Sequence, residues 1–414
     1  MQYGLIGEKL GHSFSADIHA RLGDYDYKLC ELTKEQLHEF MTKKDFCAIN
    51  VTIPYKQDVI PYLDEIDSAA NHIGAVNTIV NKNGKLYGYN TDFYGMKGLI
   101  CRENIEIKGK NVAILGTGGT SKTAYAVTKD MGARSVLKVS RTPEESQITY
   151  DELYARADEI NVIINTTPVG MYPHDGGVPV DIDRFKNLVG VVDAVYNPLN
   201  TNFVLDAMKK GIPARGGLYM LVAQAAYAAK LFFDDESMMS KTDGIFRELE
   251  AKKQNIVLVG MPGSGKTTVG TKIAQLLGRE VIDSDDEIVK DVHMTIPEYF
   301  AKYGEGEFRD RESEAIERLA QKNGVVIATG GGAVLRDKNV KMLKRNGVVV
   351  FLDRSIENIL PTEDRPLSRD REALKARYDE RYPIYRAAAD ICIDADGSID
   401  EVAERVIKAF RERK

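Results

Sequence analysis

The sequence contains no tryptophan and only four cysteines among its 414 residues. These cysteines lie far apart in the chain, without a CxxC pair or the spacing of a metal site: Cys30, Cys47, Cys101 and Cys392. Such scattered cysteines indicate reduced thiols of a cytoplasmic protein. The first residues also lack the basic and apolar regions of a signal peptide, so we expect no export.

Long hydrophobic runs are almost absent as well. The one exception, residues 218–233, is interrupted by Gln224 and Lys230 and is shorter than the roughly 20 apolar residues that a membrane span needs. We expect a buried helix there and no membrane partner. The formal net charge of −6 argues against a nucleic-acid partner and leaves small molecules as the expected ligands.

What is present is ordinary globular composition, with 43% hydrophobic and 29% charged residues. Short β-branched runs alternate with helical periodicity, which predicts an α/β fold with parallel sheets. The length and the polar stretch before residue 255 predict four parts. Residues 1–100 form a substrate domain with its own α/β fold, and residues 101–235 form a Rossmann-type domain. Residues 236–254 contain a closing helix from Thr242 and a linker at 251–254, and residues 255–414 form a P-loop domain around a parallel sheet. The helices of 218–250 are expected to pack back near the first domain.

A complete phosphate-loop motif, G-x-x-x-x-G-K-[ST], spans Gly260 to Thr267 and follows the apolar strand 255–259. Its glycines let backbone N–H groups surround phosphates at the start of a helix. We expect Lys266 to bridge the β- and γ-phosphates of ATP and Thr267 to ligate Mg²⁺. The predicted ATP contacts are Gly263, Ser264, Gly265, Lys266, Thr267 and Thr268.

Two carboxylates, Asp283 and Asp285, follow the next predicted strand. At strand spacing both would point to the same face, where one could organise Mg²⁺ and the other accept the proton of a substrate hydroxyl. Further motifs lie downstream: GEGEFRDRE at 304–312, a triple glycine at 330–332, RPLS from Arg365 and RYPIYR from Arg381. With these motifs, residues 255–414 resemble shikimate kinase.

The resemblance implies a role for each matching residue. Asp285 would hold a ring hydroxyl of shikimate and act as the base, while Asp283 would support the metal. Arg309 and Arg381 would bind the substrate carboxylate through their planar guanidinium groups, although Arg309 could also belong to a solvated helix face. Gly330, Gly331 and Gly332 would let the backbone approach the substrate, and Arg365 would reach the phosphates from a lid. That lid looks shorter than is usual, which leaves the contacts to adenine open.

A second glycine-rich turn follows the strand 111–115 and has the first two glycines of G-x-G-x-x-G, with Ser121 in place of the third. The next strand ends in a sequence without the acidic residue that an NAD site would use for the ribose hydroxyl. Arg141 there suits the 2′-phosphate of NADP, or is a surface arginine. The predicted NADP contacts are Gly116, Thr117, Gly118, Gly119, Thr120, Ser121, Ser140, Arg141 and Thr142.

Seven further motifs make residues 1–250 resemble shikimate dehydrogenase. They are GHSFSADIH from Gly11, NVTIPYK from Asn50, GAVNT from Gly74, YNTD from Tyr89, NTTPVGM from Asn165, DAVYNP from Asp193 and GLYMLVAQAA from Gly217. The order of the motifs along the chain matches the family. This resemblance adds Gly217 to the expected NADP contacts.

Reduction of a ketone needs a hydride donor and a proton donor at the developing alkoxide. By the resemblance, Lys56 is that acid, and Asp92 holds its ammonium and a substrate hydroxyl. Ser13 and Ser15 would bind the carboxylate; Thr52, Asn77, Tyr196 and Gln224 would fix the hydroxyls and the ring. The alternatives are a solvated loop lysine at 56 and a helix N-cap at 92. His12 and His19 are expected to be structural.

The sequence therefore predicts a bifunctional enzyme of aromatic amino-acid biosynthesis. One unit would reduce 3-dehydroshikimate to shikimate with NADPH, and the other would transfer the γ-phosphoryl group of ATP to the 3-hydroxyl of shikimate with Mg²⁺. Two alternatives stay open: a dehydrogenase that uses quinate and NAD, and a non-catalytic regulator built on degenerate enzyme folds. The oligomeric state cannot be predicted from the sequence.

Overall fold

The computed structural model describes residues 2–11, 14–359 and 371–413. Ser13, His12 and Arg365 therefore lie outside the described residues. Contacts divide the chain into two compact units, Met1–Leu249 and Glu250–Lys414. None of the helices in the described ranges is long and apolar enough to cross a membrane, and the run at 218–233 is a helix.

The first sheet of the first unit has six strands in the order β2-β1-β3-β5-β6-β4, with β5 antiparallel to both of its neighbours. Helix α2 covers one face, where Leu37 and Met41 pack on Ile6 and Ile49. The strands are β1 (Tyr3–Gly7), β2 (Tyr27–Glu31), β3 (Ala48–Val51), β4 (Glu65–Ile66), β5 (Thr78–Lys82) and β6 (Lys85–Tyr89); the helices are α1 (Ser15–Leu22), α2 (Lys34–Lys43), α3 (Ser68–Ile73) and the 3-10 turn η1 (Ile60–Tyr62).

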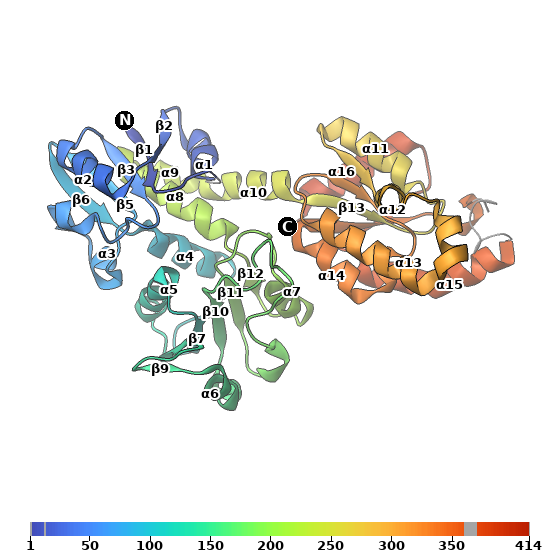
Figure 1. Cartoon of the computed structure of the whole chain (residues 1–414), viewed down its shortest axis with the longest axis horizontal. Coiled ribbons are helices and arrows are strands. Elements are labelled where there is room, and N and C mark those ends of the chain that lie inside the picture. The colour runs from blue at the N-terminus through green and yellow to red at the C-terminus, as the bar shows by residue number, and fades with distance from the viewer. Residues whose placement is uncertain (1, 12–13, 360–370, 414) are drawn as a thin grey trace. The chain divides into compact units, whose positions relative to one another are not determined.

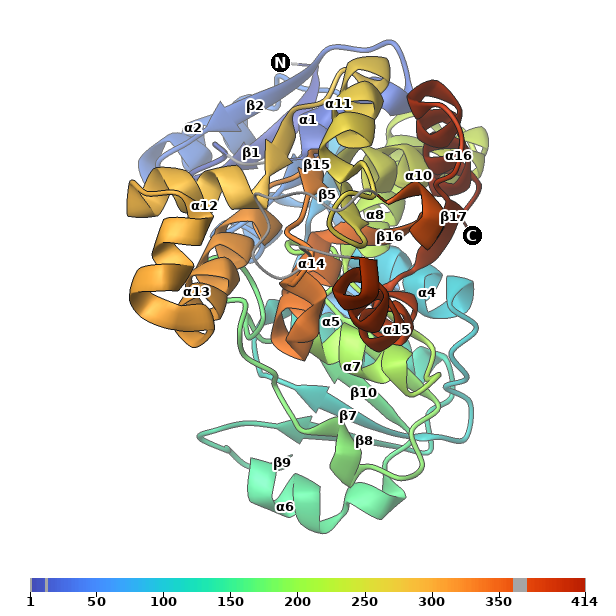
Figure 2. The ribbon, with the colours of Figure 1, turned by 90° about the vertical axis from the view of Figure 1, so that its right-hand side faces the viewer.

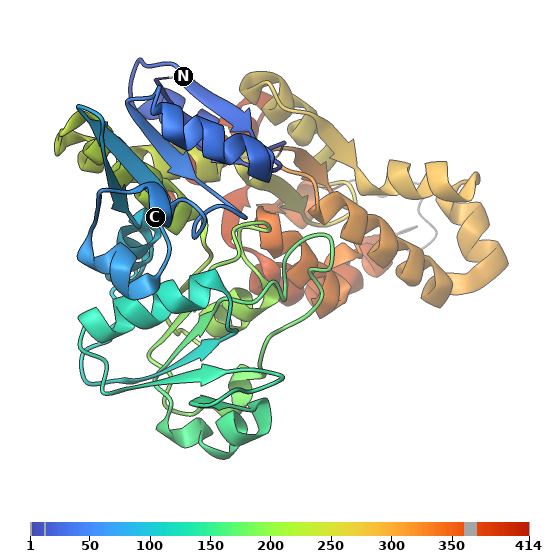
Figure 3. The ribbon, with the colours of Figure 1, turned by 60° about the vertical axis from the view of Figure 1, so that its left-hand side comes forward.

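The second sheet is entirely parallel and has the order β12-β11-β10-β7-β8-β9. Read from β9, this is the 3-2-1-4-5-6 order of the Rossmann fold, so the predicted dinucleotide fold is confirmed. Helix α5 lies along the strands (Figures 1 and 3). The elements are β7 (Asn111–Leu115), α5 (Gly119–Asp130), β8 (Ser135–Val139), β9 (Gln147–Ile148), α6 (Tyr150–Ala155), η2 (Ala157–Glu159), β10 (Val162–Asn165), η3 (Ile182–Arg184), β11 (Gly190–Asp193), α7 (Asn202–Lys209) and β12 (Ala214–Arg215).

Two long helices, α4 (Thr91–Arg102) and α8 (Leu218–Phe233), connect the two sheets of this unit. Helix α8 packs on both sheets. Val222 and Ala226 belong to the hydrophobic core of the Rossmann sheet, whereas Ala228 and Phe232 belong to the core of the first sheet. The expectation of a buried helix at 218–233 is thereby confirmed. This arrangement brings side chains of α4 and α8 to the region where the two sheets meet.

The helix expected from Thr242 is present as α10 (Thr242–Lys253), after the short α9 (Ser237–Ser240). Ile245, Phe246 and Leu249 are buried in the core of the first unit. The structure has no linker at 251–254 of the kind expected. The helix runs to Lys253, and only Gln254 separates it from the next strand, because the residues at 250–253 keep good helix propensity.

The second unit is built on a five-stranded parallel sheet in the order β14-β15-β13-β16-β17, which confirms the predicted P-loop fold. Strands β15, β16 and β17 of this sheet are labelled in Figure 2. Alternate residues of β13 face two helical layers: Val257 and Val259 pack with α13, α14 and α15, and Ile256 and Leu258 with α11 and α16. The elements are β13 (Asn255–Val259), α11 (Lys266–Leu277), β14 (Val281–Asp283), α12 (Ser284–Val292), α13 (Ile296–Ala320), β15 (Val326–Ala328), η4 (Ala333–Leu335), α14 (Asp337–Asn346), β16 (Gly347–Asp353), η5 (Ile356–Asn358), α15 (Arg371–Ala388), β17 (Ile391–Asp394) and α16 (Ile399–Glu412).

The expected geometry of Asp283 and Asp285 is wrong. The strand β14 ends at Asp283, and Asp285 lies in the first turn of α12 rather than two residues along a strand. Asp283 instead caps this helix, because its Oδ1 accepts a hydrogen bond from the Asp285 backbone N at 2.9 Å. Local capping chemistry ends the strand earlier than the pattern of alternating residues indicates.

Candidate active sites

The phosphate loop of the second unit lies between β13 and α11, as expected. Gly263 and Gly265 have φ values of +87° and +88°, a conformation that favours glycine. The ammonium of Lys266 donates to the carbonyl oxygens of Gly260 and Met261, at 3.0 Å each. These are neutral acceptors on the loop itself, so the lysine is held at the place where phosphates would bind.

Thr267 and Asp283 are brought together at the start of α11. The Thr267 hydroxyl donates to Asp283 Oδ2 at 2.6 Å. A hydroxyl and a carboxylate are oxygen ligands of the kind that Mg²⁺ takes together with water and substrate phosphates. The residues present therefore fit the ion, although within the described ranges no three His, Cys, Asp or Glu side chains gather as a metal-binding group.

The half-buried Asp285 and the buried Glu312 place their carboxylates beside Gly330. A Cβ at Gly330 would lie 2.4 Å from Asp285 Oδ1 and 3.1 Å from Glu312 Oε1, so this position requires glycine. Neither oxygen has a hydrogen-bond partner among the described residues. Burial and the nearby Asp283 and Glu312 raise the pKa of Asp285 to about 6, which suits a group that takes up a proton near neutral pH.

The two predicted arginines lie on the triple glycine. Arg309 donates to Glu312 Oε2 at 2.8 Å, and its guanidinium occupies the space that a Cβ at Gly332 would fill. Arg381 donates to the Gly331 carbonyl at 3.3 Å. The Nε atoms of both arginines are buried and without a partner in the described part of the chain. The structure thus places two guanidinium groups beside the two carboxylates, rather than leaving Arg309 on a solvated face.

Sequence reasoning missed Glu312, which is 1% exposed and anchors Arg309. The signal was present as the i, i+3 spacing of the two residues on one helix, but the alternating charges around them suggested a surface. At the other end of the phosphate loop, a cavity of about 120 Å³ is lined by Ser264, Gly265, Thr268, Arg354 and Gly397. Three of the predicted ATP contacts, Ser264, Gly265 and Thr268, line it.

In the first unit, the predicted catalytic pair is in contact. Lys56 Nζ donates to Asp92 Oδ2 at 2.6 Å, and both side chains are partly exposed, at 29% and 22%. The N-cap of α4 is Asn90, so the alternative of a capping role for Asp92 is wrong. An ammonium held on a carboxylate and open to solvent can reach a bound small molecule.

Asn77 and Gln224 join this pair through Thr91. Asn77 Oδ1 accepts from the Thr91 backbone N at 2.7 Å, and the Thr91 hydroxyl donates to Gln224 Oε1 at 3.2 Å. Gln224 on α8 can lie this close to α4 only because residue 95 is glycine. A Cβ at Gly95 would lie 2.5 Å from the Met220 carbonyl and 2.9 Å from the Gln224 Cβ. Four of the predicted residues, from four separate motifs of the sequence, therefore form one polar cluster.

The other predicted substrate residues that the structure describes are Ser15, Tyr196 and Thr52. Ser15 begins α1 and hydrogen bonds to Tyr27, whose hydroxyl donates to Asn50 Oδ1 at 2.7 Å. The ring of Tyr196 meets that of Phe14 edge to face at 5.9 Å. Thr52 packs on Gly7, where a Cβ would lie 2.7 Å from its methyl group.

His19 lies behind this region and is 1% exposed. Its ring stacks on Tyr27 with centroids 3.8 Å apart, and its Nδ1 shares a hydrogen bond of 2.5 Å with the Tyr25 hydroxyl. Burial lowers the pKa of His19 to about 3, so the ring is neutral. These contacts agree with the structural role expected from the sequence.

The glycine-rich turn after β7 fits a dinucleotide. Gly116 has φ +101°, and a Cβ at Gly118 or Gly119 would meet nothing within 4 Å, so the space beside both residues is open at the start of α5. Thr117 belongs to the same turn, Thr120 lies in the first turn of α5, and Ser121 is buried at 2% exposure in the place of the third glycine. Ser140, Arg141 and Thr142 follow β8, and Gly217 packs on the Ala194 carbonyl.

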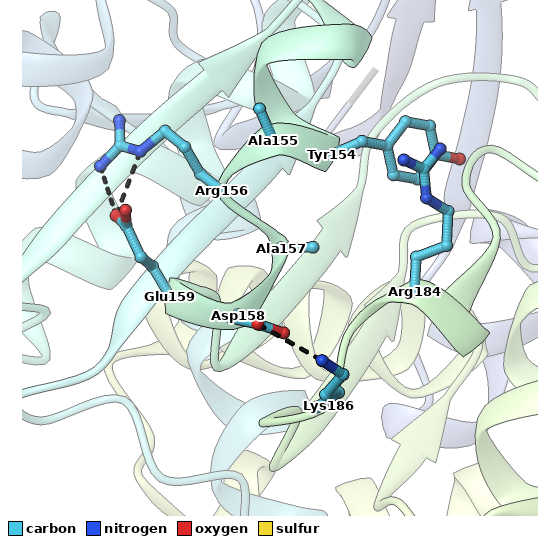
Figure 4. A pocket seen from close by; sticks show the side chains of 8 residues that line it. All are labelled: Tyr154, Ala155, Arg156, Ala157, Asp158, Glu159, Arg184 and Lys186. Atoms are coloured by element: carbon cyan, nitrogen blue, oxygen red, sulfur yellow. Dashed lines mark hydrogen bonds and ion pairs between the residues drawn. The ribbon is translucent and has the colours of Figure 1, made fainter.

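A larger hollow of about 380 Å³ lies elsewhere, at the amino-terminal end of β10 (Figure 4). Its charged side chains are satisfied by one another: Arg156 with Glu159 at 2.7 Å, Lys186 with Asp158 at 3.5 Å, and Arg184 over the ring of Tyr154 at 3.8 Å. It contains none of the predicted site residues. In parallel α/β sheets, ligands bind at the carboxyl ends of the strands, so we assign no site here.

Together, the folds and their polar clusters define a chain that joins a nicotinamide-dependent dehydrogenase to a P-loop kinase. Comparison with known proteins agrees. Residues 5–79 match the model of the shikimate dehydrogenase substrate binding domain, and residues 262–411 match the model of shikimate kinase.

Individual relatives match the first unit over nearly their whole length. The NADP(+) shikimate dehydrogenase of Clostridium beijerinckii is 38% identical over 263 residues, which are 60% of this chain and 97% of the relative. A chorismate mutase/shikimate 5-dehydrogenase fusion from Clostridium acetobutylicum is 40% identical, with TM-score 0.56 over 60% of this chain and 97% of that one. The Thermus thermophilus shikimate 5-dehydrogenase, solved with NADP(H) and shikimate, is 27% identical, with TM-score 0.52 over 59% and 99%.

The chain therefore belongs to the shikimate dehydrogenase family in its first unit and carries a shikimate kinase domain in its second. It is a bifunctional enzyme of the shikimate pathway with an NADP-dependent oxidoreductase and a kinase activity.

Proposed function

We propose that the first unit reduces 3-dehydroshikimate to shikimate with NADPH, and that the second phosphorylates the 3-hydroxyl of shikimate with ATP and Mg²⁺. The observation that carries the first reaction is the contact between Lys56 and Asp92 beside Asn77 and Gln224. For the second it is the half-buried Asp285 beside Arg309, next to a complete phosphate loop. Cytoplasmic location and small molecules as the only ligands stay predictions.

In the dehydrogenase site, NADPH supplies the hydride when bound. Lys56 Nζ gives a proton to the oxygen of the ketone as negative charge develops there, and Asp92 keeps the ammonium in place. Ser15, with Ser13, binds the carboxylate, and Thr52, Asn77, Tyr196 and Gln224 orient the ring. Arg141, with Ser140 and Thr142, takes the 2′-phosphate.

In the kinase site, Asp285 accepts the proton of the attacking hydroxyl, and Arg309 and Arg381 hold the substrate carboxylate. Lys266 moves from its two backbone carbonyls to the phosphates, where a full positive charge has a stronger partner. Thr267 and Asp283 would hold Mg²⁺. The unpaired oxygens of Asp285 and Glu312 support a substrate with hydroxyl donors, because buried acceptors without donors cost free energy.

Two matched variants test both reactions in one assay with 3-dehydroshikimate, NADPH and ATP. Lys56→Ala should reduce NADPH consumption by about 10²–10⁴-fold while leaving phosphorylation of added shikimate unchanged. Asp285→Asn should do the reverse, since it removes only the kinase base. Each variant serves as the control for the other.

Loss of less than tenfold in the affected reaction would contradict the role of that residue. Equal turnover of quinate with NAD in the wild-type chain would instead replace the proposed dehydrogenase substrate and cofactor. Absence of both reactions in the wild-type chain would favour the regulator alternative.

A further inference from the structure

Asp193 is a buried carboxylate, 0% exposed, at the carboxyl end of β11. It is not one of the residues assigned to binding or catalysis. Its Oδ1 accepts hydrogen bonds from Asn165 Nδ2 at 2.9 Å and from the Val195 backbone N at 3.0 Å. Its Oδ2 accepts from the Thr201 hydroxyl at 2.6 Å. One buried side chain therefore binds three different segments of the Rossmann domain.

Asn165 extends this network to the loop after β10. It stands opposite Asp193 in the parallel register and is also 0% exposed. Its Oδ1 accepts from the backbone N of Thr167 at 3.0 Å and from the Thr167 hydroxyl at 2.7 Å. Its carbonyl accepts from the Ala194 backbone N at 2.9 Å. The side-chain pair thus fixes both loops at the carboxyl edge of the sheet.

These loops are in direct contact with the segments that would hold the cofactor and the substrate. The Gly217 backbone N donates to the Val195 carbonyl at 2.8 Å, and Tyr196 is the next residue of that loop. Thr166, between Asn165 and Thr167, donates to the Leu115 carbonyl at 2.6 Å and packs on Gly116. A shift of the pair would move three proposed contacts at once: Gly116, Tyr196 and Gly217.

We propose that Asp193 and Asn165 are positioning residues, which hold these loops so that the nicotinamide ring is fixed beside the substrate. Neither side chain is exposed, so both act through the loops and not by touching a ligand. The proposal rests on the NADPH-dependent reduction proposed above. Because small misplacements of reacting groups reduce rates strongly, the pair should affect hydride transfer more than cofactor binding.

The chain offers a matched control for Asn165 at the other end of the same strand. Asn161 precedes β10, accepts from the Asn111 backbone N at 3.0 Å and donates to the Asn187 carbonyl at 3.3 Å. Asn165→Ala and Asn161→Ala both remove an asparagine that links neighbouring segments. Only the first lies at the carboxyl edge, where the dinucleotide would bind.

We expect Asn165→Ala to lower kcat for 3-dehydroshikimate by at least tenfold while changing the KM for NADPH less than threefold. The primary isotope effect with NADPH deuterated at the transferred position should increase, because hydride transfer becomes slower. Asn161→Ala should lower the melting temperature without changing kcat or the isotope effect. Asp193→Asn, which keeps an oxygen for Asn165 and Val195, should retain most of the activity that Asp193→Ala loses.

A second readout needs no substrate. NADPH bound to the wild-type chain should show high nicotinamide fluorescence anisotropy, which Asn165→Ala lowers at full saturation and Asn161→Ala does not. Equal anisotropy, kcat and isotope effects in the two variants would overturn the positioning role. If the wild-type chain bound NADPH but did not reduce 3-dehydroshikimate, the proposed reaction would fail, and the anisotropy comparison would still decide on the positioning residues.

Discussion

Two lysines at the proposed centres are held in opposite ways. Lys56 is bound to a carboxylate, whereas Lys266 is bound to two neutral carbonyl oxygens. An ion pair keeps the first ammonium at its place during proton transfer. Neutral acceptors compete weakly with phosphate oxygens for the second ammonium.

Arg141 allows a test of cofactor choice. It is exposed and lies close enough to Tyr150 to counteract the rise in pKa that burial causes for that phenol. Arg141→Asp should weaken NADP much more than NAD, because it removes a charged hydrogen bond worth about 1.5–3 kcal/mol and adds repulsion. Binding titrations with both dinucleotides would measure this change. Equal losses for NADP and NAD would show that Arg141 is a surface residue without a role in discrimination.

His19 gives a prediction on pH and stability. Its pKa is about 3 in the folded chain, against about 6.5 in the unfolded chain, so below pH 6.5 protons bind the unfolded state first. The free energy of unfolding should therefore fall by about 1.4 kcal/mol for each pH unit below 6.5. The groups around the ring are Tyr25, Tyr27, Phe232 and Asn50, and none of them carries a charge in this range.

The variant His19→Phe keeps a stacking ring and removes the titrating group. Between pH 6.5 and 5, its unfolding free energy should change by about 2 kcal/mol less than that of the wild-type chain. Denaturant titrations at the two pH values measure this difference. Parallel pH profiles would mean that His19 is not kept neutral by burial.

At the scale of single residues, the sequence predicted contacts best where a motif is continuous. The phosphate loop is such a motif, and it lies where it was predicted; the pair of Lys56 with Asp92 joins two separate motifs and was expected only from the family resemblance. Glu312 was missed because the alternating charges around it suggested an exposed helix face, whereas it is buried against Gly330 of the triple glycine, which is distant in the sequence. Asp193 and Asn165 were quoted only as parts of motifs, since their hydrogen bonds depend on the register of two strands.

At the scale of elements, glycine decides how closely α4 and α8 approach. Gly95→Ala should destabilise the first unit by about 1–3 kcal/mol and reduce dehydrogenase turnover, because the new Cβ would press on the Met220 carbonyl and move Gln224. Gly98, one turn further on the same helix, is the matched control. A Cβ there would meet Tyr219 at 3.6 Å, an ordinary contact.

Gly98→Ala should therefore leave turnover unchanged and stabilise the chain by about 0.4–1 kcal/mol, since alanine lowers the entropy of the unfolded chain. Thermal unfolding and NADPH consumption measure both variants. If the two alanines behaved alike, the close approach at Gly95 would not control the position of Gln224.

The elements themselves were largely predictable, since strands and helices alternate with clear periodicity. The boundaries were less so. Asp283 and Asp285 were expected at strand spacing, but β14 ends at Asp283 and Asp285 lies in a helix, because an aspartate that caps a helix competes with extension of the strand. The expected linker at 251–254 is mostly helix, because a polar, charged composition is equally typical of an exposed helix.

At the scale of the whole molecule, helix α10 contains the boundary between the two units. Leu249 is buried in the core of the first unit, whereas Ala251 packs with the cluster around Ile256 in the second. Arg279 donates to the carbonyls of Ala251 at 2.7 Å and Gln254 at 2.8 Å. The end of the helix thus belongs to the kinase, although its beginning belongs to the dehydrogenase.

This division predicts where the chain can be cut. Residues 1–249 and 250–414 should each fold and keep their own activity, because each piece retains its buried residues and a complete site. A kinase piece that begins at Gln254 would lose the Ala251 carbonyl and leave a half-buried guanidinium with one acceptor fewer. A hydrogen bond to a charged group is worth about 1.5–3 kcal/mol, so this shorter piece should melt several degrees below the piece from Glu250.

Residues 1–253 should melt at the same temperature as 1–249, which serves as the control for length. Equal melting temperatures for the two kinase pieces, with equal phosphorylation of shikimate, would show that Glu250–Lys253 contribute nothing to the second unit and that the boundary lies after the helix.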